Sequence, residues 1–600
     1  MVLSGLEEKV AESVDRALLM RHVEEISKYV RLSGEPGERE AFEYIAHVLR
    51  GYGFVTELLM HDAYISLPGP AALEVLSPAK RAIECITHAF GQSTPPQGVV
   101  AELVYAGDGS EQSYAGLDVT NKFVLLDGMA SPGAAGIATK MGALGQVHTG
   151  VPDGQMHEMI VSNVWGNPDD ETKANLPRTF VLSIAFSEGE VLRQALAAGP
   201  VRIRAKASVS TRWTKIPLLV ASIKPPERRG TEPAGAEPAG IERAGAEPSG
   251  AERDTFLLLS GHLDSWYRGA MDNGSANATM IEVARVIAEN RAQLRRGLRL
   301  CFWSGHSHGR YAGSAYYVDN HWEDLERNCI LHLNTDSTGA VGATNLLDAN
   351  VMAETRGLAA HAVGAVTGGA FRGRRMSRNG DQSFWGAGIP SLFVSLSQQG
   401  PGPGGGGGLG WWWHTCHDTP DKIAPDFLVR DTKVYAVVAA RVLTSALLPL
   451  DYSACAREWV DELEALASKA GARFDLNAIV ARAKSFRERA ERLQQAAGRA
   501  EVACSPHAAE AINKCLVRLG RVLIPVSYTR AGRFAHDPAL DVHPLPDIAD
   551  AARLGQVAEG SDEEKFLKVR LQRGSNRTLA ALKDATALVD EALDIIEKGE

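Results

Sequence analysis

The feature that most constrains the fold of this chain is the alternation of strand-like and helix-like segments over residues 255–450. Short apolar runs with β character, among them TFLLLSGH, LRLCFWSG and CILHLNTD, are separated by longer segments with helical spacing. Strands that alternate with helices of about 10 to 15 residues form an α/β sheet. The sequence therefore predicts an α/β domain in which a mixed sheet is covered by helices on both faces, with functional residues at the carboxyl ends of its strands.

The segments outside this domain differ from it in composition. Residues 1–74 show helical spacing and are assigned to the N-terminal helical part of the same domain, whereas residues 75–215 contain short β-rich runs and predict a β-rich insert. Residues 216–254 include repeated Glu-Pro-Ala-Gly units with few large apolar groups and predict a flexible linker. Residues 451–600 contain long amphipathic segments, which are typical of a helical packing or dimerisation domain.

Composition excludes several classes of protein. Apolar residues make up 45% of the 600 residues and charged residues 23%, which is ordinary for a folded globular protein. The formal net charge of −10 argues against binding to nucleic acid or to an anionic membrane. The seven cysteines include no Cys-x-x-Cys pair, and the acidic N-terminal segment does not resemble a signal peptide. We therefore expect a cytoplasmic protein with no nucleic-acid and no membrane partner.

Metal-binding residue types follow three predicted strands and one glycine-rich loop. A single histidine or aspartate at such a place more often caps a helix or ties a turn. Four segments that all deliver imidazole or carboxylate to one edge of a sheet favour a metal site instead. The residues concerned are His262, Asp264 and Asp272 after the first strand, His306 to His308 after the second, Asp336 after the third, and His414 in the loop.

The spacing around His262 resembles that of a known family. The segment H-x-D-S at 262–265, followed by G-x-x-D-N-x-S at 269–275, is similar to the co-catalytic zinc aminopeptidases, which include glutamate carboxypeptidase and the non-enzymatic transferrin receptor. The resemblance covers nearly the whole chain. It implies a protease-associated domain for the β-rich insert, a metallopeptidase domain at 255–450, and a homodimer formed through the C-terminal helical domain.

The resemblance also implies a role for each matching residue. His262 and Asp336 would bind one metal ion, Asp272 would bridge to a second ion, and His414 would bind that second ion. Asp264 would orient the ring of His262 and count among the catalytic residues. The implied reaction is hydrolysis of an amide or peptide bond in a small molecule or short peptide. The implied cofactor is one or two divalent metal ions, zinc first, with iron, manganese or nickel as alternatives.

The chain departs from the family directly after the second strand. His306 and Ser307 stand where the family has a Glu-Glu pair that supplies a general base and a metal ligand. His306 could replace the base, or it could bind metal, and the sequence leaves both roles open. Serine is a weaker ligand than carboxylate for a divalent ion, so a site with a single metal is also open.

Four further residues are expected to border the substrate. Trp413 stands where carboxypeptidase relatives have a tyrosine, and its indole N–H could donate to the oxyanion. Asp381, Gln382 and Arg378 lie in a segment that, in the family, borders the substrate pocket.

Two other functions remain open from the sequence. One is a catalytically silent dimeric scaffold of the transferrin receptor type, because both glutamates are replaced. The other is a mononuclear non-haem metal enzyme acting on a non-peptide substrate, since His262, Asp272 and His414 form a two-histidine, one-carboxylate set.

Overall fold

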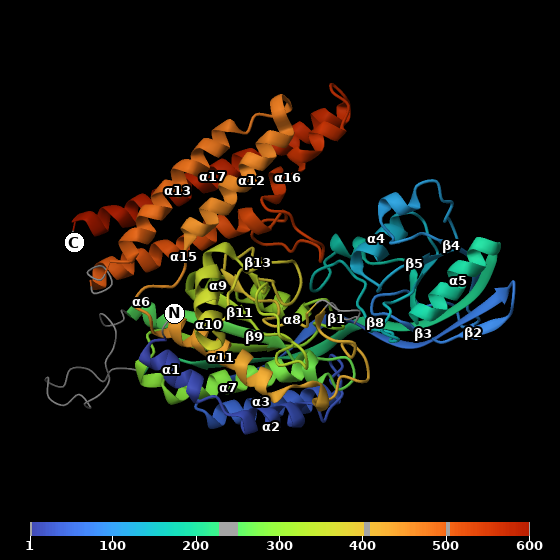
Figure 1. Ribbon diagram of the computed structural model, residues 1–600, viewed down its shortest axis with the longest axis horizontal. Helices are drawn as coiled ribbons and strands as arrows, with labels where there is room; N and C mark the ends of the chain where they lie inside the picture. The colour runs from blue at the N-terminus through green and yellow to red at the C-terminus, as the bar shows by residue number, and fades with distance from the viewer. Residues whose placement is uncertain (1–2, 227–249, 401–407, 500–504, 599–600) are drawn as a thin grey trace.

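The computed structural model describes residues 3–226, 250–400, 408–499 and 505–598 (Figure 1). An α/β body occupies the lower left of Figure 1, the insert lies to its right, and a layer of C-terminal helices lies above the body. The predicted linker at 216–254 falls largely on residues outside this description. Its flanks are ordered, because residues up to Ile223 belong to strand β8 and Gly250–Asp254 form helix α6.

A single path of hydrogen-bonded strands runs through the body and the insert. Its order is β13-β12-β14-β11-β9-β10-β8-β4-β5-β6-β7-β3, with β1 paired to β8 and β2 paired to β1. In the body, β9, β10, β11 and β14 are parallel, and β8 runs antiparallel to β10. The body strands are β9 (Phe256–His262), β10 (Gly297–Trp303), β11 (Cys329–Asn334), β12 (Asn350–Val351), β13 (Arg374–Arg375) and β14 (Ser391–Leu392). The mixed sheet is as predicted.

Two long strands connect the body to the insert. Strands β1 (Val55–Ser77) and β8 (Val201–Ile223) pair antiparallel over almost their whole length. The domain boundaries predicted at residues 74 and 216 are therefore wrong, since both fall inside these strands. Propensity changes little along a strand shared by two parts of a sheet, so the sequence carries no signal there.

The sheet of the body is buried on both faces. Along β9, Leu257 and Leu259 belong to one apolar core, whereas Phe256 and Leu258 belong to another, as the alternation of side chains in a strand requires. Helices pack on both cores. They are α1 (Gly5–Glu12), α2 (Arg16–Ile26), α3 (Pro36–Gly51), α7 (Ala276–Glu289), α10 (Arg356–Thr367) and α11 (Pro425–Thr444) on the first face, and α8 (Ala312–Asn320) and α9 (Trp322–Asn328) on the second.

The insert has its own apolar cores and contains helices as well as strands. Leu103, Phe123 and Leu182 pack with Leu192 of α5 on one side, while Ala138 of α4 belongs to a core on the other side. Its elements are β2 (Arg81–Ile83), β3 (Cys85–Thr87), β4 (Val99–Tyr105), β5 (Phe123–Leu126), α4 (Pro132–Lys140), β6 (Gly145–His148), β7 (Phe180–Ile184) and α5 (Phe186–Ala198).

The C-terminal helices share an apolar core with the body. Leu358 of α10 and Trp459 of α12 are both buried in it, so this layer is joined to the α/β body by burial of apolar surface. The helices are α12 (Tyr452–Ala470), α13 (Asn477–Ala497), α15 (Pro506–Tyr528), α16 (Pro546–Ala549) and α17 (Asp562–Lys598). Over the part of the chain described, none of the helices is long and apolar enough to cross a membrane.

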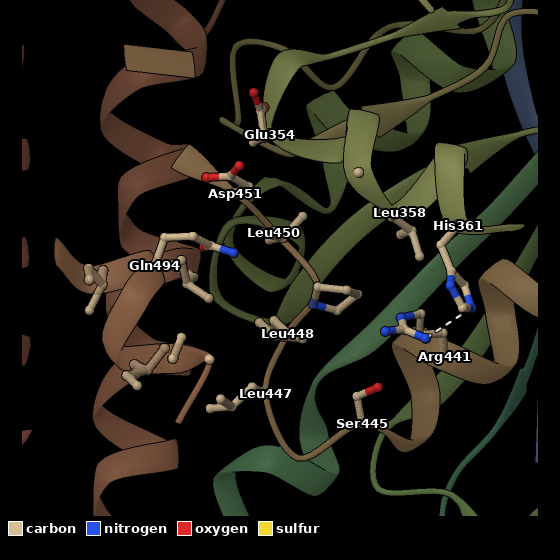
Figure 2. A pocket seen from close by; sticks show the side chains of 17 residues that line it. Glu354, Leu358, His361, Arg441, Ser445, Leu447, Leu448, Leu450, Asp451 and Gln494 are labelled. Carbon is tan, nitrogen blue, oxygen red and sulfur yellow. Dashed lines mark hydrogen bonds between the residues drawn. The ribbon is translucent and has the colours of Figure 1, made fainter. Parts of the chain in front are cut away.

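A cavity of about 340 Å³ lies at the junction between the body and the C-terminal helices. Figure 2 shows Leu358 and His361 of α10 on one side and Gln494 of α13 on the other, with Leu448 in the segment that joins the two layers. Arg441 donates to the His361 ring at 3.0 Å. None of the residues that line this cavity is one of the predicted metal ligands.

Candidate metal centre

The predicted metal ligands meet at one end of the body sheet. His262 is the last residue of β9, Asp336 follows β11, and Asp272 lies in the irregular segment Ala270–Ser275 that leads into α7. His414 comes from the loop before α11 and adopts a left-handed backbone conformation with φ of 57°. Because β9 and β11 are parallel neighbours, their carboxyl ends deliver His262 and Asp336 to the same edge.

Asp272 lies between two imidazole rings. One carboxylate oxygen lies 3.1 Å from Nε2 of His262, and the other lies 3.0 Å from Nε2 of His414. The backbone of this aspartate is held by Asp418, whose carboxylate accepts the N–H groups of Met271 and Asp272 at 2.8 and 2.9 Å. Each oxygen of Asp272 thus faces a different imidazole, which is the arrangement that a bridging ligand needs.

Asp336 completes a compact group of ligand atoms. Its Oδ1 lies 3.9 Å from Nε2 of His262, and one ligand atom from each of His262, His306 and Asp336 lies within 4.8 Å of the others. The Nε2 atom of His262 is buried and forms no protein hydrogen bond in the described part of the chain. Buried polar atoms are normally paired, so an orphaned imidazole nitrogen facing two carboxylates fits a cation.

The pKa values of His262, Asp272 and Asp336 are shifted by burial and by the charges of their neighbours. Burial by itself would lower the pKa of His262, but its aspartate neighbours outweigh burial and hold that pKa well above its ordinary value. Burial opposes ionisation of Asp272, yet the two imidazoles hold the pKa of Asp272 below its ordinary value. Burial raises the pKa of Asp336 to about 6, and the negative charge of Asp272 contributes to the increase.

His306 lies against this group and is held by Asp381. Its Nδ1 lies 2.9 Å from Oδ2 of Asp381, and because a carboxylate only accepts hydrogen bonds, Nδ1 carries the proton. The ring stacks on that of His262, with centroids 3.7 Å apart and planes inclined by 16°. The Nε2 atom of His306 therefore has a free lone pair. Asp381, which we expected to contact substrate, instead orients His306.

The role predicted for Asp264 requires a correction. The Nδ1–H of His262 donates to the backbone carbonyl of Asp264 at 2.8 Å, while the carboxylate lies 3.7 Å away and beyond hydrogen-bond distance. That carboxylate instead accepts from the backbone N–H of His306 at 3.2 Å, from Ser307 N–H at 2.8 Å and from the Ser33 hydroxyl at 2.8 Å. Asp264 therefore fixes the turn after β10, and it holds His262 through its backbone carbonyl and the charge of its carboxylate rather than through a side-chain hydrogen bond.

Ser307, where the resemblance implies a carboxylate, carries a neutral hydroxyl. Ser307 is buried, and its Oγ has no hydrogen-bond partner in the part of the chain that the structure describes. This oxygen is therefore available only as a weak neutral ligand.

The predicted substrate residues divide into two groups. Trp413 is at the site, where its ring stacks on that of His414 with centroids 3.6 Å apart. Gln382 is fully buried, and its amide pairs with the Phe393 carbonyl at 3.0 Å and the Ser391 hydroxyl at 2.6 Å. A substrate role for Gln382 is therefore wrong, because its hydrogen-bonding capacity is already used within the protein.

Arg378 is likewise a structural residue and not a substrate contact. It is buried, and its guanidinium donates to the backbone carbonyls of Gln382 at 2.8 Å and Asp537 at 3.0 Å while lying 3.6 Å above the ring of Trp165. These contacts tie the C-terminal domain and the insert to the body. The guanidinium cannot reach an acidic substrate without breaking them.

The insert contributes residues that the sequence analysis missed. His414 Nδ1–H donates to the backbone carbonyl of Glu158 at 2.6 Å, and Glu158 N–H donates back to the carbonyl of His414 at 3.0 Å. The ring of His157 donates to the carbonyl of Trp413 at 2.6 Å. Burial raises the pKa of the Glu158 carboxyl to about 7. The insert therefore orients the loop that carries His414.

A second group of missed residues comes from the N-terminal helical part. The guanidinium of Arg31 is fully buried and donates to the carbonyls of Leu263 at 2.7 Å, Arg268 at 2.6 Å and Gly269 at 2.9 Å. These bonds hold the loop between His262 and Asp272. Neither Arg31 nor Glu158 lies near a recognisable motif, so pattern reading alone had no signal for them.

Comparison with known proteins gives consistent matches. Residues 244–439 match the model of peptidase family M28. A probable glutamate carboxypeptidase of Zea mays is 24% identical over 499 residues, which cover 73% of this chain and 68% of that protein. Carboxypeptidase Q of Bos taurus is 22% identical over 301 residues, and the alignment covers 48% of this chain and 57% of the bovine protein.

Solved structures share the fold. The aminopeptidase from Aneurinibacillus sp. strain AM-1 superimposes with a TM-score of 0.53 at 20% identity, covering 73% of this chain and 96% of that one. A zinc aminopeptidase from Bacillus subtilis gives a TM-score of 0.50 at 18% identity, covering 72% and 95%. The mixed α/β architecture of the body is therefore that of these aminopeptidases.

Proposed function

Because the chain carries a domain of peptidase family M28, a family of metallopeptidases, we propose that it is a metal-dependent hydrolase that cleaves an amide or peptide bond with a divergent metal site. The observation that carries this proposal is the position of Asp272 between two imidazoles from distant segments, with its oxygens 3.1 Å from Nε2 of His262 and 3.0 Å from Nε2 of His414. A short peptide or a small non-peptide amide is the substrate class we propose.

The residues present fit a divalent metal such as zinc. His262, Asp272 and Asp336 offer one nitrogen and two carboxylates to one position, and Asp272 and His414 offer a carboxylate and an imidazole to a second. Both are ligand types that zinc accepts. When bound, the metal would activate water and polarise the carbonyl of the scissile bond. Because Ser307 replaces a carboxylate at the second position, we propose tight binding at the first position and weaker binding at the second.

We assign His306 as the group that takes a proton from the attacking water. An imidazole nitrogen binds a metal along a lone pair that lies in the ring plane. The rings of His262 and His306 are stacked almost parallel at 3.7 Å, so one ion cannot lie in both ring planes. This geometry favours His306 beside the metal over His306 as a ligand. Its Nε2 would accept the proton and return it to the leaving amine, while Asp381 stabilises the imidazolium.

The test separates the role of a base from that of a ligand. We expect Asp272→Ala to lose both bound metal and turnover, since this residue faces both imidazoles. We expect His306→Gln to keep the metal content of the wild type and to lose about 100-fold or more in kcat. His417→Gln, which alters an exposed histidine in the same loop, is the control. Zinc is measured by elemental analysis, and turnover is measured on a panel of dipeptides and N-acyl amino acids.

The same measurements decide between this proposal and its alternatives. Loss of metal from His306→Gln would make His306 a ligand and overturn its role as a base. A wild-type protein that binds metal but hydrolyses none of the amides would contradict the hydrolase. Absence of both metal and turnover would favour a silent scaffold.

A second candidate function rests on a specific observation. The Nε2 atoms of His262 and His414 lie 3.1 and 3.0 Å from the oxygens of Asp272, and the three residues form a two-histidine, one-carboxylate set. Such a set is used by mononuclear non-haem iron enzymes. Iron-dependent oxygen consumption by a protein that hydrolyses no amide would favour this candidate.

We further propose that the protein is a homodimer formed through its C-terminal helices. Phe566 and Val569 of α17 are 77% and 53% exposed and lie one helical turn apart on the same face. Neighbouring large apolar side chains left in water support an interface with a second copy.

A further inference from the structure

A chain of hydrogen bonds leads from the insert to His306. The indole Nε1–H of Trp165 donates to the Ser383 hydroxyl at 2.8 Å, and the hydroxyls of Ser383 and Ser314 lie 2.9 Å apart. The Ser314 hydroxyl donates to Oδ1 of Asp381 at 2.8 Å, and Oδ2 of Asp381 lies 2.9 Å from Nδ1 of His306. Trp165, Ser383, Ser314 and Asp381 are all nine-tenths or more buried.

The chemistry of the two ends fixes the direction of every bond in this chain. An indole N–H can only donate, so Ser383 accepts from Trp165 and has its own proton left for Ser314. Ser314 then accepts from Ser383 and gives its proton to Asp381. A carboxylate can only accept, so Asp381 must also receive the Nδ1 proton of His306. No other assignment of protons satisfies all four contacts.

We propose that this chain locks His306 as the Nδ1–H tautomer and so keeps the Nε2 lone pair facing the metal centre. Trp165, Ser383 and Ser314 are positioning residues that act through Asp381. The inference rests on the proposed function, because it assigns how the proposed base is held. The insert would then contribute to the orientation of His306, since Trp165 belongs to the insert and not to the body.

The tautomer is directly measurable and independent of turnover. We expect the ¹⁵N spectrum of histidine-labelled, metal-free protein above pH 8 to show His306 as Nδ1–H, its signal being identified by loss in His306→Gln. Asp381→Asn keeps the shape of the side chain but offers an N–H to the ring. We expect that variant to invert the tautomer to Nε2–H, and retention of Nδ1–H would overturn the proposal.

Kinetics test whether Trp165 acts through Asp381. We expect Asp381→Asn to lower kcat by about 1,000-fold or more with little change in KM, as reversal of a catalytic histidine tautomer does. Trp165→Phe removes one neutral hydrogen bond and should lower kcat by about fivefold. The matched control is Trp385→Phe. Trp385 is also buried near Arg378, but its indole donates to Gln382, which is not part of this chain of hydrogen bonds. We expect less than about twofold from the control.

Combining the variants gives the decisive result. If Trp165 acts through Asp381, Trp165→Phe should have no further effect in the Asp381→Asn background. Additive losses, or equal losses in Trp165→Phe and Trp385→Phe, would overturn the role of Trp165. Ser383→Ala breaks the same chain with a smaller change in volume and replaces Trp165→Phe should that variant fail to fold. If the wild type hydrolyses no amide, the proposed function fails, and the tautomer spectrum still decides this inference.

Discussion

At the scale of single residues, the site is built from groups whose neighbours decide what they do. His262 and His306 have the same side chain, yet one donates Nδ1–H to a backbone carbonyl and faces two carboxylates, whereas the other donates to a buried aspartate. Their environments therefore suit one ring to metal binding and the other to proton transfer. The sequence could not separate these roles, because the partner Asp381 lies 75 residues from His306 in the chain.

One buried residue makes a prediction about stability and pH. Burial raises the pKa of Glu354 to about 7, and its Oε1 has no hydrogen-bond partner in the described residues. The folded protein thus holds this proton more tightly than the unfolded chain. Its stabilising contribution is full below about pH 4.5 and is lost as the pH rises through about 7.

The variant Glu354→Gln carries a neutral amide at every pH. We expect the melting temperature of the variant minus that of the wild type to be higher at pH 8 than at pH 5. The corresponding difference in free energy of unfolding should change by an amount on the order of a few kcal/mol. Glu464→Gln, at an exposed glutamate paired with Lys484, is the control. A difference from the wild type that is the same at both pH values would contradict the prediction.

At the scale of elements, the close approach of helix α15 to the body depends on two glycines. A Cβ at Gly520 would lie 2.7 Å from the Tyr452 hydroxyl and 2.8 Å from the backbone carbonyl of Gly388. The neighbouring Arg521 is buried and donates to the same Gly388 carbonyl at 2.8 Å. The helix is thus docked by backbone contact and a buried guanidinium.

This contact decides whether replacing Gly520 by alanine stabilises or destabilises the protein. Alanine normally stabilises the interior of a helix by about 1 kcal/mol relative to glycine. At Gly520 the added methyl would have to displace backbone, and overpacking of this kind costs about 1 to 3 kcal/mol. We therefore expect Gly520→Ala to lower the unfolding temperature. Gly555→Ala, where a Cβ meets nothing within 4 Å, should leave it unchanged or raise it. A stabilised Gly520→Ala would show that α15 can move away from the body.

At the scale of the whole molecule, the three regions are coupled. Strands β1 and β8 run through both body and insert, and the C-terminal helices share an apolar core with α10 and α11. The insert also reaches the site through Glu158 and Trp165. The proposed active site therefore depends on the assembled protein and not on the α/β body by itself.

The proposed dimer gives a prediction at this scale. We expect light scattering after size exclusion to give about twice the 64.3 kDa of one chain for the wild type. Phe566→Glu should reduce this to the mass of one chain, because a charge would replace apolar contact. Phe534→Glu is the matched control, since Phe534 is 76% exposed but is not part of α17 and packs on Trp322 of α9. A monomeric wild type, or equal effects of both variants, would contradict the proposed interface.

The sequence by itself determined the α/β class and which residue types lie at the strand ends, because alternating periodicity and metal-binding spacing are local properties of the chain. Only the tertiary structure decided how these groups are used. Asp264 holds the His262 ring through its backbone carbonyl and uses its carboxylate to support the turn after β10, and Gln382 and Arg378 are buried structural residues. The positioning of His306 and His414 by Asp381 and the insert depends on contacts between distant segments, which no local pattern encodes.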